Sequence, residues 1–288
     1  METSMMINAM LQSALYPMLA AGAVTLLLCK VVGRTERDYI TAIGLCAGFV
    51  TGFFAISGFA SFPPLRVADW TPYVVITATL LFSLFSGRKL IFRLAAAALF
   101  ILAMSWLYLR PLLRSWSTTQ DLSWMAVCSS LLLLLWLAWE WAGPKPQKRE
   151  LPLLMVVIAT GASVVTLIGS SAKLAQISGA LAASCGALFL VSFVCPKLKL
   201  GSAAIGVFLT ALAGQLINAH FYVEVSWIAL CLIYISGFAI LLTRLPRLAR
   251  LSMPLRSGVV LAAALVPIVI AVLLMVFAGS QEDPYDYY

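Results

Sequence analysis

The chain has 288 residues, of which 62% are hydrophobic and 10% are charged, whereas about 25% of the residues in a typical soluble domain are charged. A soluble fold of this length cannot bury so much apolar surface, so the composition excludes an ordinary globular protein and indicates an all-α membrane helix bundle solvated by lipid. The net charge of +8 does not indicate nucleic-acid binding, because the basic residues are spread over short connections and not gathered in one patch.

Ten apolar stretches are long enough to cross about 30 Å of hydrocarbon at about 1.5 Å per residue. The sequence therefore predicts one integral membrane domain over residues 1–288 with about ten transmembrane helices. Nine and eleven are the alternative counts, because the third stretch is short and tightly joined to the fourth. Residues 280–288 form a short acidic tail. The stretches are residues 10–31, 39–61, 70–87, 90–109, 121–142, 151–171, 174–195, 201–219, 223–243 and 257–279.

Lysine and arginine are distributed unevenly over the connections between these stretches. The odd-numbered connections hold 15 of the 19 basic residues, and basic residues in short loops favour the cytoplasmic side. We therefore expect a multi-pass protein of the bacterial cytoplasmic membrane with both termini outside. The ninth connection, "RLPRLARLSMPLR", is expected to lie along the headgroups and to attract anionic lipid through Arg244, Arg247 and Arg250.

Small residues recur at every fourth position in three of the stretches, one of which contains "GLCAGFVTG". A glycine inside a soluble helix costs about 1 kcal/mol relative to alanine, whereas in lipid small residues allow helix backbones to approach closely. We interpret these rows as helix contact surfaces; for the eighth stretch a translocation path is the alternative. The rows are Gly44, Gly48 and Gly52; Gly179, Ala183 and Ala187; and Gly206 and Gly214 with Thr210.

The second and seventh stretches are related by a shift of 135 residues, which also aligns Pro17 with Pro152 and Thr25 with Thr160. Each half would contain five stretches, so the second half would be inverted in the membrane, and the loop charges alternate accordingly. This pattern predicts an inverted repeat of residues 10–142 and 151–279. The alternative is that apolar helices with alternating loop charge look alike without being related. Drug/metabolite transporters have an analogous layout, although those carriers generally keep both termini in the cytoplasm.

Few ionisable residues lie within the stretches, and such residues are functional candidates. Glu140, in "WLAWEWAG", is expected at the cytoplasmic interface, where it would pair with a nearby base or couple to a proton or cation; Arg93 is expected to reach the same interface. His220 and Glu224, near the other end of the eighth stretch, form either part of a wetted loop or a pH-responsive pair. The single histidine and the scattered cysteines predict no metal site and no cofactor.

The connection between the second and third stretches, "SFPPLRVADWTPYVVI", contains Pro63 and Pro64, followed after five residues by Trp70. This PP-x5-W pattern resembles a loop of uncharacterised polytopic membrane proteins of planctomycete bacteria. The resemblance rests on this loop and on the general layout. No activity is known for such proteins, so no functional residue is transferred from them. From the residues themselves, Asp69 is expected to cap the next helix and Trp70 to anchor it at the interface.

Two functions fit these features. The first is a secondary transporter of a small apolar or weakly polar solute, whose halves rock around a polar mid-membrane cavity lined by residues such as Thr25 and Thr160. The alternative is a non-transporting scaffold or accessory subunit of a membrane complex, which the shortage of buried charge favours. An enzyme is not predicted, because the sequence has no nucleotide-binding, zinc-protease or serine-hydrolase motif and no paired carboxylates at mid-bilayer.

Overall fold

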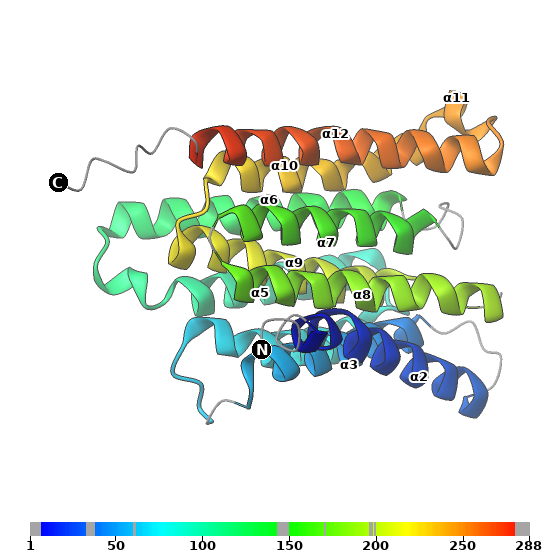
Figure 1. Cartoon of the computed structure of the whole chain (residues 1–288), viewed down its shortest axis with the longest axis horizontal. Coiled ribbons are helices and arrows are strands. Elements are labelled where there is room, and N and C mark those ends of the chain that lie inside the picture. The colour runs from blue at the N-terminus through cyan, green and yellow to red at the C-terminus, as the bar shows by residue number, and fades with distance from the viewer. Residues whose placement is uncertain are drawn as a thin grey trace.

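The structure is a computed structural model that describes residues 7–32, 38–59, 62–142, 150–169, 171–195, 198 and 200–279. These residues form a bundle of long helices that run roughly parallel to one another (Figure 1), and they contain no β-strand. Ten helices within these ranges are long and apolar enough to cross a membrane. The predicted fold class, an all-α polytopic membrane bundle, is therefore confirmed, and the protein is a multi-pass integral membrane protein.

The spanning helices agree with the predicted stretches to within a few residues at most ends. Two short elements, η3 (Leu112–Arg114) and α11 (Pro246–Ala249), lie in connections. The spanning elements are η1 (Leu11–Leu15) with α2 (Tyr16–Val31), α3 (Tyr39–Ser57), η2 (Val67–Trp70) with α4 (Thr71–Phe85), α5 (Leu90–Leu109), α6 (Thr118–Ala142), α7 (Glu150–Ile168), α8 (Ala172–Val194), α9 (Ser202–Val223), α10 (Trp227–Gly237) with η4 (Phe238–Arg244), and α12 (Met253–Gly279).

Three helix ends differ from the prediction for local reasons. Gly58 has a φ of 72° and ends α3 at Ser57, before the predicted residue 61. Helix α9 continues past residue 219 to Val223 and ends at Glu224, which is left-handed with a φ of 61°. Asp69 lies inside η2, and the N-cap of α4 is Trp70. The prediction that Asp69 caps this helix is therefore wrong, because a 3₁₀ turn starts the span earlier.

The two ends of the bundle carry different connections. Helices α2, α6 and α8 and segment η4 end at one end, which we call the basic end, and α3, α5, α7 and α9 end at the opposite end (Figure 1). Helix α12 ends at this opposite end, and the first helix runs toward the basic end (Figure 1). This follows from an even number of spans. Which end faces the cytoplasm stays a prediction from the loop charges.

Helix α9 lies at the centre of the bundle and contacts α3, α4, α5, α6, α7, α8 and α10. Every residue from 203 to 219 is buried. Its small residues receive aromatic rings from neighbouring helices: the ring of Phe82 lies against Gly206, and the hydroxyl of Tyr108 lies 2.7 Å from the β-carbon position of Gly214. At Gly206 and Gly214 the row in α9 is therefore filled by aromatic side chains of α4 and α5.

Helices α2, α3 and α8 meet through small residues. The side chain of Thr25 occupies the space beside Gly44, and the β-carbon positions of Gly48 and Gly52 lie 2.5 Å from the Ser184 hydroxyl and 2.6 Å from the Ala180 β-carbon. In α8 it is thus Ala180 and Ser184 that face α3. In the predicted row beside them, Ala187 is near Gly22 of the first helix, and the β-carbon position of Gly179 lies 3.7 Å from the Ser163 hydroxyl of α7 and 3.9 Å from Ser13 of the first helix. Ala183 is half-buried.

The inverted repeat of residues 10–142 and 151–279 stays a prediction. Both halves begin with a closely packed helix pair, α2 with α3 and α7 with α8. Helix α12 also packs along α7, whereas the corresponding helices α6 and α2 lie at separate levels of the bundle (Figure 1). The helix contacts of the two halves therefore match only in part.

Candidate functional site

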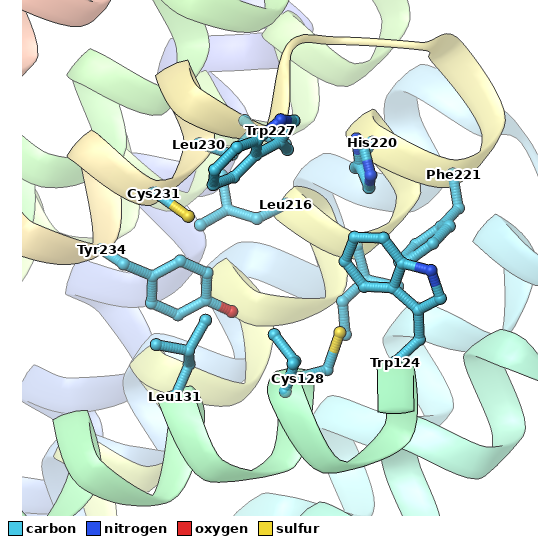
Figure 2. A pocket seen from close by; sticks show the side chains of 12 residues that line it. Trp124, Cys128, Leu131, Leu216, His220, Phe221, Trp227, Leu230, Cys231 and Tyr234 are labelled. Carbon is cyan, nitrogen blue, oxygen red and sulfur yellow. The ribbon is translucent and has the colours of Figure 1, made fainter. Parts of the chain in front are cut away.

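An apolar cavity of about 320 Å³ lies between α6, α9 and α10, toward the opposite end of the bundle (Figure 2). Val127 and Trp227 at its edge are 46% and 57% exposed. Val127 lies nine residues into α6, so part of the exposed lining is on the side of the bundle and not at its end. The lining comes from α6 (Trp124, Val127, Cys128 and Leu131), α9 (Leu216, Ile217, His220 and Phe221) and α10 (Trp227, Leu230, Cys231 and Tyr234).

His220 places an imidazole at the end of this cavity (Figure 2). Its Nδ1 lies 3.1 Å from the carbonyl oxygen of Val225, and its ring packs against Trp124 and Phe221 at centroid distances of 5.5 and 4.7 Å. Glu224 is exposed, and its left-handed backbone closes α9 with a bond from its N–H to the Ala219 carbonyl. The structure therefore turns His220 toward Val225 and the cavity and does not pair it with Glu224.

Glu140 belongs to a buried polar cluster at the basic end. Arg93 of α5 donates to the Glu140 carboxylate, and the Ser202 hydroxyl at the start of α9 donates to the same oxygen at 2.9 Å. The Glu140 side chain is 8% exposed, and its Oε2 has no partner among the described residues. From the sequence, Glu140 and Arg93 were both predicted at this interface, but their pairing with each other was not predicted. The cluster joins α5, α6 and α9.

A second ion pair at the basic end was missed by sequence reasoning. Glu150, at the first residue of α7, accepts two hydrogen bonds of 2.9 Å from the Arg256 guanidinium of α12 and one of 3.0 Å from Ser257. The Glu150 side chain is 3% exposed. A carboxylate at a predicted loop edge gives no signal of such burial, because its partner is 106 residues away. The pair fastens α12 to α7.

Thr25 and Thr160, two residues of the predicted polar lining, lie in different surroundings. Thr25 is buried but donates to the Ala21 carbonyl of its own helix at 2.7 Å, and Ser184 donates to the Ala180 carbonyl at 2.7 Å. Thr160 is exposed on the surface of the bundle. The structure therefore does not bring Thr25 and Thr160 together. Within the described ranges, no group of three or more His, Cys, Asp or Glu residues could hold a metal ion.

The arginines of the ninth connection have unequal surroundings. Arg244 donates to the Trp141 carbonyl and lies over the Trp141 ring, 5.0 Å from its centroid. Arg247 and Arg250 are exposed. Arg244 is thus occupied by α6, and the exposed arginines are the ones that remain available to an anionic lipid.

Compared with models of known protein families and with curated proteins, the chain matches none.

Proposed function

We propose that this multi-pass membrane protein binds a small apolar or weakly polar molecule inside the bilayer. The observation that carries the proposal is the cavity between α6, α9 and α10. Its volume of about 320 Å³ lies at the lower end of the range for small-molecule sites. An empty void lined by apolar side chains costs packing energy, and the lateral opening gives access to molecules dissolved in the hydrocarbon.

Helix α10 supplies a means of admitting such a molecule. It ends at Gly237, near the middle of the ninth span, where the 3₁₀ segment η4 begins, and a change of helix type inside a span often marks a hinge. Gly237 itself is held, because its carbonyl accepts a 2.9 Å bond from the Trp139 indole and Leu135 lies 2.8 Å from its β-carbon position. Bending about this fixed point would widen the cavity mouth.

A more specific version of this proposal is that the protein transports the bound molecule. The helix packing limits the movements by which such transport could occur. Rocking of residues 10–142 against 151–279 would separate Gly48 from Ser184 and withdraw α9 from α3, α4, α5 and α6. A carrier with this structure would therefore work by local movement of α10 and not by rocking of its halves.

A scaffold or accessory subunit is the second candidate, favoured by the same interlocking and by the ion pairs Arg93–Glu140 and Arg256–Glu150. These contacts hold the helices together at the basic end, which would give a partner protein a fixed surface to bind. Affinity capture from native membranes in mild detergent tests this candidate. A stoichiometric partner protein supports it, and a partner-free monomer that binds an apolar probe contradicts it.

The binding proposal is tested with 1-bromododecane, because bromine quenches tryptophan fluorescence on contact and Trp124 and Trp227 line the cavity. We expect saturable quenching of the purified protein. Leu131→Trp fills the cavity and should abolish the saturable part. Leu134→Trp is the matched control, since Leu134 lies on the same helix, is 55% exposed and does not line the cavity.

Equal, unsaturable quenching in the wild type and both variants would overturn the binding proposal. Transport is then measured separately as release of the probe from proteoliposomes. Binding without any release above protein-free vesicles would leave the carrier form without support and favour the accessory subunit.

A further inference from the structure

Two side chains place polar atoms at the apolar cavity from different helices. His220 lies at the end of α9, and Tyr234 points its hydroxyl oxygen toward the space between α10 and α6 (Figure 2). His220 is three residues from the end of α9, and Tyr234 is seven residues into α10. At about 1.5 Å per residue, the imidazole lies near the membrane interface and the phenol about 10 Å along its own helix. The cavity thus has a shallow polar point and a deeper one.

The hydrogen bond of His220 decides which tautomer faces the cavity. A carbonyl oxygen can only accept, so the contact of Nδ1 with the Val225 oxygen requires the proton on Nδ1. The neutral ring then presents Nε2 as an acceptor. Val225 is 1% exposed, and Trp124 and Phe221 pack against the ring, which fixes its orientation. Nε2 has no hydrogen-bond partner in the part of the chain that the structure describes.

We infer that the ligand of this cavity is a largely hydrocarbon molecule with a hydroxyl group at one end, whose hydroxyl donates to Nε2 of His220 while its chain runs between Leu216, Leu230 and Leu131. This inference rests on the proposed binding function and names its substrate class. A volume of about 320 Å³ holds roughly ten heavy atoms, at about 30 Å³ for each water-sized group. A longer chain continues through the lateral opening into the bilayer.

The test compares three brominated probes of matched chain length by tryptophan quenching. We expect 11-bromo-1-undecanol to bind roughly threefold to tenfold more tightly than 1-bromododecane, the gain of one hydrogen bond to the imidazole acceptor. 11-Bromoundecanoic acid at neutral pH should bind more weakly than the alcohol, because its carboxylate cannot donate. Equal affinity for the alcohol and the hydrocarbon, or a preference for the acid, would overturn the inference.

Two variants assign the preference to a residue. His220→Phe keeps an aromatic ring but removes the acceptor, so it should bind the alcohol and the hydrocarbon equally. Tyr234→Phe removes only the deeper hydroxyl and should retain the preference for the alcohol. The reverse pattern would place the polar end of the ligand deep in the cavity and contradict the inference. If no probe gives saturable quenching in the wild type, the cavity is not a binding site, and the proposed function itself is contradicted.

Discussion

Gly48 of α3 lies directly against Ser184 of α8: a β-carbon built on the glycine would be 2.5 Å from the serine hydroxyl oxygen. That hydroxyl donates to the Ala180 carbonyl at 2.7 Å, so it is held in place by its own helix. The same β-carbon position is 2.7 Å from the Pro17 carbonyl oxygen of α2, which belongs to the backbone. Three helices therefore meet at a residue that has no room for a side chain.

Gly48→Ala should lower the free energy of unfolding by about 1–3 kcal/mol, the usual cost of overpacking. The matched control is Gly22→Ala in α2, since the β-carbon position of Gly22 is at an ordinary contact distance, 4.0 Å from the Ala187 β-carbon. Thermal unfolding in detergent measures both variants. If Gly48→Ala unfolds at the same temperature as Gly22→Ala, the close contact of α2, α3 and α8 is incorrect.

Glu140→Gln should destabilise the protein by about 1–3 kcal/mol. Removing one partner of a buried ion pair costs about 3–5 kcal/mol, and solvent reduces this cost because the Arg93 side chain is 21% exposed. Lys89→Gln, at an exposed residue beside the start of α5, is the control for loss of charge. Unchanged stability of Glu140→Gln would remove the structural role and return Glu140 to the candidates for proton or cation coupling.

Arg256→Lys should also lower stability, by about 1–3 kcal/mol, although it conserves the charge. The Arg256 guanidinium binds both oxygens of Glu150, and an ammonium group cannot reproduce that two-point geometry. Arg247→Lys, at an exposed arginine of the same end, should have no measurable effect. Equal unfolding temperatures for the two variants would show that the paired geometry contributes nothing.

The predicted sidedness can be read by cysteine labelling of intact cells with an impermeant maleimide. Thr119→Cys lies at the start of α6, at the opposite end, and Ser252→Cys lies beside α11, at the basic end; both positions are exposed. Because basic loops stay in the cytoplasm, we expect labelling above that of the unmodified chain for Thr119→Cys only. If only Ser252→Cys is labelled, the protein has the opposite orientation to the predicted one.

Anionic lipid should bind at the exposed arginines of the ninth connection. Each arginine near a membrane surface contributes about 1 kcal/mol toward anionic lipid, or roughly a fivefold change in affinity. Native mass spectrometry should therefore show fewer retained phosphatidylglycerol molecules in Arg247→Gln/Arg250→Gln. Arg66→Gln/Arg110→Gln removes the same charge at the opposite end and should retain them. Equal loss in both variants would indicate a general charge effect.

The spans could be predicted from the sequence because crossing hydrocarbon is a property of each segment alone: enough consecutive apolar residues at a fixed rise. Contacts between segments could not. Arg93 and Glu140 were both placed at one interface, yet their pairing depends on α5, α6 and α9 meeting there. Glu150 gave no signal, since its partner Arg256 lies in the last helix.

The candidate site was predictable only in its one unusual residue. His220 was singled out as the only histidine, but Glu224 was its expected partner, and the backbone at the end of α9 turns Glu224 away. The cavity exists because the side chains of α6, α9 and α10 do not fill the space between these helices. That property depends on all three helices together and cannot be predicted from one segment. Thr25 and Thr160 occupy equivalent positions in the repeat alignment, but their neighbours bury the first and expose the second.

The enclosure of α9 has a consequence for biogenesis. Among the described residues, the helices with the main contacts to α9 are α3, α4, α5, α6, α7 and α8, which precede it in the chain, and α10, which follows it. Ribosomes therefore deliver this segment when most of its surroundings have already been synthesised. It can leave the insertion machinery and pack directly against helices that are already in the membrane. Its glycines, Gln215 and Asn218 are then exposed to lipid only briefly. If synthesis halts before α10, the side of α9 that α10 covers stays exposed. We therefore expect the nascent chain at this point to be a target for membrane quality control.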